Sequence, residues 1–284
     1  LSFEIAGSPE FQQLHSEALK DPLRPQPLTL QAAMVRKNPV PQPVRANVRL
    51  SPTINLLIVI ARPGAARDVG YRTISRPLVE GLRQADLPVR IEILRPGSYE
   101  ALVNHLQGVQ DQHGAGFYHV IHFDVHGALL AFAQFDELEK GLEVDRYPSH
   151  PRRYGRGRLD PYQGRKAFLF LESEKEGHPD PLEASELANL LLKHQIPIAV
   201  LNACQSGKQV GATETSLGSR LMQAGVQMVL AMSYSVTVSA AELMMQTLYG
   251  QLFARHELRT AIRRARLELY HRKGRRAYFN QIID

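Results

Sequence analysis

The sequence contains a single cysteine, Cys204, and no tryptophan among its 284 residues. One thiol cannot form an internal disulfide, and it cannot provide the several thiolates of a structural zinc site. The chain has no apolar run long enough to span a bilayer, and no charged-then-apolar leader with a small-residue cleavage site. These absences disfavour the disulfide-rich, thiolate-zinc and membrane-spanning classes, and we expect a cytoplasmic protein that does not bind membranes.

Sequence motifs typical of metal sites, nucleotide-binding sites and serine hydrolases are also absent. No set of carboxylates and imidazoles shows metal-ligand spacing, and no acidic loop has the EF-hand pattern. The chain lacks a Gly-x-Ser-x-Gly elbow, a P-loop and a Gly-x-Gly-x-x-Gly fingerprint. We therefore expect neither a metal nor a cofactor, and the serine-hydrolase, NTPase and dinucleotide-binding classes are disfavoured.

The net charge of +6 comes largely from arginines near the C-terminus. Such a cluster can bind nucleic acid. It can equally form a solvated helix face that pairs with acidic residues, here Glu257 and Glu268. No nucleic-acid-binding motif accompanies it, so we favour the helix face and expect no direct nucleic-acid binding. The cluster comprises Arg255, Arg259, Arg263, Arg264, Arg266, Arg272, Lys273, Arg275 and Arg276.

Residues 1–53 are rich in proline, which disfavours long helices and central strands. We predict a short helix at Phe11–Leu19 and an edge strand at Leu28–Val35, in a segment that packs on the core. From Ile54 onward apolar runs alternate with helical patterns, and residues 54–284 are assigned to one domain. Strands are predicted at Ile54–Ala61, Val89–Leu94, Tyr118–Val125, Lys166–Glu172, Ile198–Asn202 and Met228–Met232. Helices are predicted at Ile74–Gln84, Tyr99–Gln107, Leu182–Lys193, Ser216–Ala224, Ser239–Arg255 and Glu257–Arg272.

This alternation predicts an α/β fold, with a mostly parallel sheet of about six strands between two helical layers. Such sheets place their functional sites at the carboxyl ends of strands. The segment Ala131–Arg165 breaks the alternation and is interpreted as an inserted loop. Its basic run, Arg152–Arg158, is expected to be exposed.

Two predicted strands end in the two halves of a thiol–imidazole pair. One leads into His126 and Gly127, and the other leads into Cys204. An imidazole can raise the thiolate fraction of a nearby cysteine and can transfer protons during acyl transfer. The backbone N–H groups of Gly127 and Cys204, both predicted in turns, are candidate donors to an oxyanion. A lone cysteine or histidine is usually a packing residue, but the paired strand ends favour catalysis. His122 is interpreted as a core or supporting histidine.

The two motifs resemble the CHAT group of caspase-like peptidases. They read Ile121-His-Phe-Asp-Val-His126-Gly127 and Val200-Leu-Asn-Ala-Cys204-Gln-Ser-Gly207. Similar sequence follows at Ser216–Met232 and Ser233–Ala241, whereas Ser16 stands where many relatives carry Trp. The resemblance implies a caspase-like α/β/α sandwich. It also implies a cysteine endopeptidase that uses His126 and Cys204, with oxyanion donors at Gly127 and Cys204. Relatives act on protein or peptide substrates and are commonly controlled by repeat or sensor domains or partner proteins.

The resemblance also points to a substrate pocket. In related acidic-pocket peptidases, the residues two before the His and two before the Cys line the pocket for the residue preceding the scissile bond. Here these are Asp124 and Asn202. A carboxylate in that pocket predicts cleavage after Arg, less well after Lys and poorly after Asp. With this preference, the basic run Arg152–Arg158 is a candidate self-cleavage site or pseudosubstrate, and a simple solvated insertion is equally open. The alternatives are that Asp124 orients His126 or caps a turn. For the whole chain, the alternative is a catalytically silent caspase-like scaffold that binds other proteins.

Overall fold

The chain forms two compact units in the computed structural model. The first comprises Leu1–Pro39, Gly70–Val89 and Val236–Asp284, and the second comprises Val40–Val69 and Arg90–Ser235. The described residues are 1–8, 11, 16, 19–24, 26–36, 46, 49–64, 79–80, 88–143, 156, 159–173, 177–203, 222, 226–231, 237–272, 275–276 and 282–283.

The second unit is built on a sheet with the strand order β10-β9-β5-β3-β4. Within it β3 and β5, β5 and β9, and β9 and β10 run parallel. Near-continuous apolar runs such as that of β3, which is buried after its first residue, are typical of parallel strands covered on both faces. The α/β class and the mostly parallel sheet are therefore confirmed, with five strands in the described sheet where about six were predicted. The bounds are β3 (Ile54–Ile60), β4 (Val89–Leu94), β5 (Val120–Asp124), β9 (Ile198–Asn202) and β10 (Met228–Ala231).

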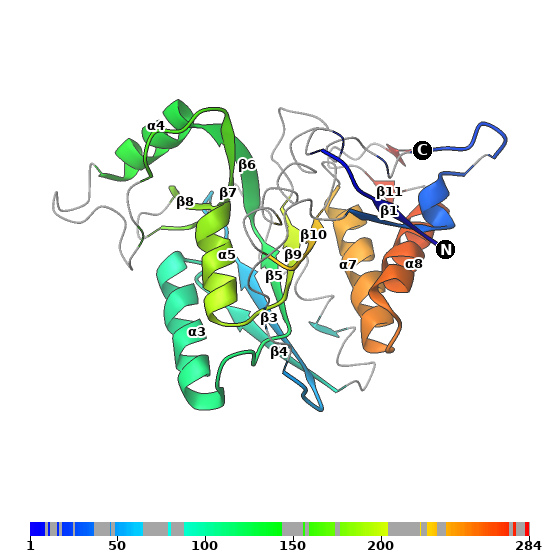
Figure 1. Cartoon of the computed structure of the whole chain (residues 1–284), viewed down its shortest axis with the longest axis horizontal. Helices are drawn as coiled ribbons and strands as arrows, with labels where there is room; N and C mark the ends of the chain where they lie inside the picture. The colour runs from blue at the N-terminus through cyan, green and yellow to red at the C-terminus, as the bar shows by residue number, and fades with distance from the viewer. Residues whose placement is uncertain are drawn as a thin grey trace. The chain divides into compact units, whose positions relative to one another are not determined.

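Helices α3 (Tyr99–His113) and α5 (Ala184–Lys193) cover one face of this sheet (Figure 1). Their apolar residues form one buried cluster with Val59 of β3, Phe123 of β5 and Leu201 of β9. Alternate residues of a strand point to opposite faces. The polar residues next to Phe123 and Leu201 therefore belong to the face that α3 and α5 do not cover.

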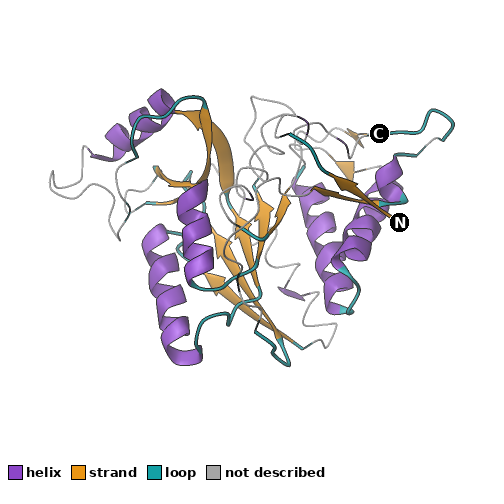
Figure 2. Cartoon of the chain, in the orientation of Figure 1, coloured by secondary structure: helices purple, strands orange, loops and turns teal. Residues whose placement is uncertain are grey.

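Strand β5 leads through a bend at Val125 into a second sheet (Figure 2). Its strands are β6 (His126–Ala131), β7 (Arg165–Glu172) and β8 (Pro179–Glu183), all antiparallel, in the order β6-β7-β8. The run predicted as a fourth strand of the parallel sheet is therefore a strand, β7, but in a different sheet. An apolar run specifies burial and does not specify which strands pair with it.

Two further segments differ from the sequence predictions. Pro179 and Pro181 lie in β8, at the edge of the second sheet, and not at the entry to a helix. An edge strand tolerates residues that have no N–H. The predicted loop Ala131–Arg165 includes helix α4 (Phe132–Glu143), which packs on the second sheet through Phe132 and Phe135.

The first unit contains two helices packed against each other, α7 (Val238–Phe253) and α8 (Leu258–His271). Helix α8 also contacts the N-terminal segment, where η2 (Leu28–Leu30) precedes β2 (Ala33–Arg36). The predicted edge strand over Leu28–Val35 is thus half a 3-10 turn and half a strand. Strand β2 pairs in parallel with β1 (Ser2–Ile5), and β11 (Arg275–Arg276) pairs with β12 (Ile282–Ile283).

Three predicted helices lie largely outside the described residues: Phe11–Leu19, Ile74–Gln84 and Ser216–Ala224. The other helices and strands agree with the predictions to within a few residues, apart from α3, which continues to His113. In the part of the chain that the structure describes, no helix is long and apolar enough to cross a membrane.

Candidate active site

The candidate site lies at the carboxyl ends of two adjacent parallel strands. Strands β5 and β9 pair with Asp124 level with Asn202, the last residue of each strand. His126 follows Asp124 by two residues, and Cys204 follows Asn202 by two residues. Cys204 itself lies outside the described residues.

His126 and Gly127 are strand residues and not turn residues. The bend falls at Val125, and β6 begins at His126, level with Phe170 of β7, followed by Gly127 level with Leu169. His126 is half-buried and Gly127 is buried. The predicted turn at Gly127 is therefore wrong, because the chain crosses directly from β5 into an antiparallel pair with β7.

Asp124 is a buried carboxylate with an internal counter-charge. It is 4% exposed, and its Oδ2 accepts a hydrogen bond from Nη2 of Arg62 at 2.5 Å. Its Oδ1 accepts from Nδ2 of Asn202 at 3.1 Å. The two residues predicted to line the substrate pocket are thus in contact, and a buried arginine shares the site with them.

Sequence analysis missed Arg62, which follows β3. Its Nη1 donates to the backbone carbonyls of Ala61 at 2.9 Å and Asp124 at 2.6 Å. Its own N–H donates to Oε1 of Glu172 in β7 at 2.8 Å. The available signal was an arginine directly after a buried apolar run, at the strand end where such sheets place their sites.

His122 lies two residues before Asp124 on the same face of β5 and is fully buried. Burial lowers the pKa of His122 to about 4, with Asp124 raising it and Arg62 lowering it further. The imidazole is therefore neutral at physiological pH. The role of His122 as a core or supporting histidine stays a prediction.

Arg156, in the predicted exposed basic run, is buried. Its Nη1 donates to both carboxylate oxygens of Asp180 at 2.9 and 2.8 Å, and its Nη2 donates to the carbonyl of Pro181 at 2.5 Å. The guanidinium also lies 3.4 Å from Glu186 and 4.4 Å from the centre of the Tyr99 ring. Burial alone lowers the pKa of Arg156, but the two carboxylates raise it above its ordinary value. The basic run is therefore anchored to the second unit at this position, and Arg152, Arg153 and Arg158 lie outside the described residues.

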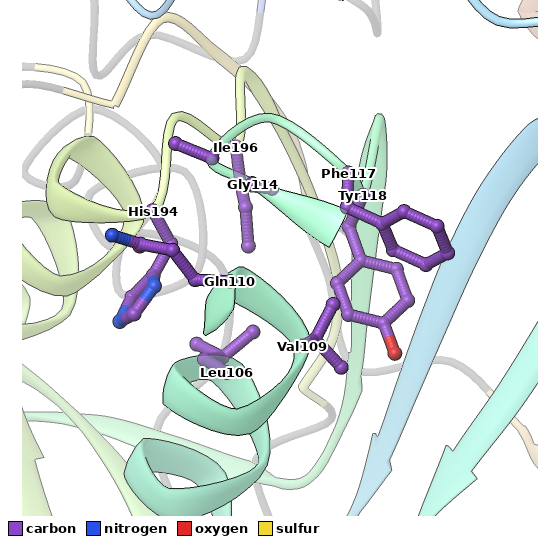
Figure 3. A pocket seen from close by; sticks show the side chains of 9 residues that line it. Leu106, Val109, Gln110, Gly114, Phe117, Tyr118, His194 and Ile196 are labelled. Atoms are coloured by element: carbon purple, nitrogen blue, oxygen red, sulfur yellow. The ribbon is translucent and has the colours of Figure 1, made fainter. Parts of the chain in front are cut away.

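A separate pocket lies at the opposite end of the strands (Figure 3). It is lined by Phe117 and Tyr118, which precede β5, and by Ile196, which precedes β9. His194 lines it as well, and among the described residues neither ring nitrogen of His194 has a hydrogen-bond partner. Burial lowers the pKa of His194 to about 4, with Lys193 lowering it further and Asp111 raising it.

We predict that His194 makes the protein acid-sensitive. The folded-state pKa lies below the unfolded value of about 6.5, so the unfolded state binds more protons between these two values. Stability should therefore fall as the pH drops from 6.5 towards 4, by about 2 kcal/mol for this residue. Urea unfolding should show that the free energy of unfolding falls less between pH 7 and pH 4.5 for His194→Leu than for the wild type. The exposed His256→Leu serves as the control, and equal losses in wild type and His194→Leu would contradict the prediction.

Residues 9–284 match the family model of the CHAT domain, so the chain belongs to the CHAT family. The members of this family are caspase-like, in agreement with the parallel sheet and the strand-end motifs. No curated protein matches the chain. In the described part of the sequence, no group of histidine, cysteine and acidic side chains is arranged to hold a metal ion.

Proposed function

We propose that the chain is a cysteine endopeptidase that hydrolyses peptide bonds through Cys204 and His126. The observation that supports this most directly is the register of β5 and β9, whose last residues, Asp124 and Asn202, are level and precede His126 and Cys204 by two residues each. Membership of a caspase-like family supports the same reaction class. The competing proposal, a catalytically silent scaffold, keeps the fold and predicts no turnover.

In the proposed mechanism the Cys204 thiolate attacks the carbonyl carbon of the scissile peptide bond. Protonated His126 then gives its proton to the leaving amine, and a thioester remains. Next, His126 takes a proton from water, the water attacks the thioester, and the thiol is released. The N–H groups of Gly127 and Cys204 would donate to the oxyanion. Strand β6 is an edge strand of its described sheet, and alternate N–H groups of an edge strand point away from the ladder.

A preference for Arg, and then Lys, before the scissile bond stays a prediction based on Asp124 and Asn202. The buried carboxylate and its contact with Asn202 are compatible with a pocket at this position. Arg62, however, already provides the counter-charge. We therefore expect a modest preference, smaller than an uncompensated carboxylate would give.

Fluorogenic peptides that differ only in the residue before the scissile bond test the specificity. We expect kcat/KM for Arg to exceed that for Leu by about tenfold, and Asp to be the poorest, since an added carboxylate would face Asp124. Cys204→Ala serves as the background control. Equal rates for Arg, Leu and Asp would contradict the predicted specificity while leaving the peptidase proposal intact.

The basic run gives a second test through self-processing. Cleavage after an arginine requires its side chain to enter the substrate pocket, and the Arg156 side chain is held by Asp180 and Glu186. If the run is cut, we expect the cuts after Arg152, Arg153 or Arg158. Mass spectrometry of wild type and Cys204→Ala after incubation maps the ends, and a cut mainly after Arg156 would contradict the prediction.

We further propose that the substrate is a protein or peptide and that another domain or partner protein regulates access to the site. Direct nucleic-acid binding is not part of this proposal. The wild type should therefore elute from a DNA column at low salt, like a non-binding protein of similar charge.

A further inference from the structure

We infer that Arg62 is a positioning residue for the proposed dyad. Its guanidinium binds Asp124 at the end of β5, and Asp124 in turn binds Asn202 at the end of β9. The backbone N–H of Arg62 binds Glu172 of β7, the strand that pairs with β6. This inference rests on the proposed function, and it gives Asp124 a role in geometry in addition to, or in place of, substrate recognition.

The side-chain contacts of Arg62 lie at the ends of adjacent strands. Ile60, Asp124 and Asn202 are level in the adjacent strands β3, β5 and β9, and all three point to the same face. Arg62 follows Ile60 by two residues, and its side chain crosses to Asp124, which in turn contacts Asn202. The chain Arg62–Asp124–Asn202 therefore spans three neighbouring strand ends.

The backbone N–H of Arg62 also connects it to the sheet that contains His126. Glu172, which accepts from the N–H of Arg62, is the last residue of β7. Two residues earlier in β7, Phe170 is level with His126. Arg62 thus contacts the end of β5, two residues before His126, and also the strand beside which His126 lies.

The contacts between Arg62 and Asp124 are shielded from solvent and directional. The side chains of Arg62 and Asp124 are 5% and 6% exposed. In such an environment a planar guanidinium with several fixed donors cannot be replaced by the single ammonium of lysine. Displacing Arg62 would leave a buried carboxylate and two backbone carbonyls without these donors, so the pair stabilises one arrangement of the strand ends.

The experiment compares wild type, Arg62→Met, Arg62→Lys and His126→Ala, with Arg90→Met as a matched control. Arg90 is an arginine of the same unit whose side chain is 51% exposed. Because the chain has one cysteine, the rate of alkylation by iodoacetamide between pH 5 and pH 9 reports Cys204 alone. Circular dichroism and thermal unfolding establish that each variant is folded.

We expect Arg62→Met to lower kcat by about 100-fold for Arg, Lys and Leu peptides alike, with little change in KM. Arg62→Lys should lose about tenfold, and Arg90→Met should match the wild type. The alkylation profile of Arg62→Met should move towards that of His126→Ala, because the imidazole no longer lies in place beside the thiol. If Arg62→Met does not fold, the Arg62→Lys profile decides the question in the same way.

Two results would overturn the inference. One is a folded Arg62→Met, or a folded Arg62→Lys, with the wild-type kcat and alkylation profile. The other is faster cleavage of Arg peptides alone by Arg62→Met, which would make Arg62 a competitor for the substrate pocket. Failure of the proposed function looks different: wild type and His126→Ala would then share one alkylation profile and neither would cleave peptide.

Discussion

Replacing Cys204 by alanine is expected to abolish peptide hydrolysis, and replacing His126 by alanine is expected to reduce it at least about 1000-fold. The reason is that the thiolate is the only proposed nucleophile, and the imidazole both activates it and protonates the leaving amine. The measurement is kcat/KM on an arginyl fluorogenic peptide, with the fold of each variant checked by circular dichroism.

His178→Ala is the matched control for this prediction. It removes another imidazole from the same unit, at a half-buried position next to β8. We expect His178→Ala to retain activity within a few-fold of wild type. If His126→Ala retained comparable activity, His126 would not be the acid–base group.

The second large effect that we expect is a loss of folding stability when Arg156 is replaced by methionine. The replacement removes the guanidinium that pairs with Asp180 in β8 and with Glu186 in the first turn of α5. Removing one partner of a buried ion pair typically costs about 3 to 5 kcal/mol, and the contact with the Tyr99 ring is lost as well. Urea unfolding of Arg156→Met at pH 7 should show a loss of this size.

Two comparisons make this prediction specific to the ion pair. Arg90→Met removes an exposed arginine that pairs with Glu92, and should cost less than about 1 kcal/mol. The double variant Arg156→Met with Asp180→Asn should be more stable than Arg156→Met alone, because one uncompensated carboxylate is gone. If Arg156→Met lost no more unfolding free energy than Arg90→Met, the prediction that the buried Arg156 ion pair stabilises the fold would be contradicted.

Replacing Arg156 should also disturb the candidate active site around His126. Pro181, whose carbonyl accepts from Arg156, is level with Phe170, and Phe170 is level with His126. The three residues form one row across β8, β7 and β6. A displaced β8 would therefore disturb the strand beside which His126 lies, and Arg156→Met should lose some activity along with stability.

Strands could be predicted from apolar runs rich in β-branched side chains, as in β3 and β9, and from β-branched residues alternating with charged ones, as in β4. Strands β3, β4 and β9 match their predicted bounds to within one residue. Helix α4 was missed because the acidic residues between Phe132 and Leu138 suggested a solvated loop, although the apolar side chains follow helical spacing on the second sheet. The second sheet itself was not predictable, since antiparallel pairing of β6 with β7 is a long-range choice that no local pattern specifies.

The same distinction applies to the site. Asp124 and Asn202 could be selected because each lies on a predicted strand, two residues before His126 and Cys204 respectively. The contact between Asp124 and Arg62 could not be predicted, although Arg62 follows a buried apolar run, because the two residues lie 62 apart in the sequence and their pairing depends on the order of β3 and β5 in the sheet. The anchored position of Arg156 was hidden for the same reason: a basic run in a sequence does not reveal which of its side chains meets buried carboxylates.

The most direct test of the peptidase proposal is covalent labelling by an arginyl peptide with an electrophilic ketone. In the folded wild type we predict one adduct per chain, located on Cys204 by peptide mapping, and formed much faster than in His126→Ala or in urea-unfolded protein. Labelling that is no faster in the folded wild type than in the unfolded chain would contradict the proposal and favour a silent caspase-like scaffold.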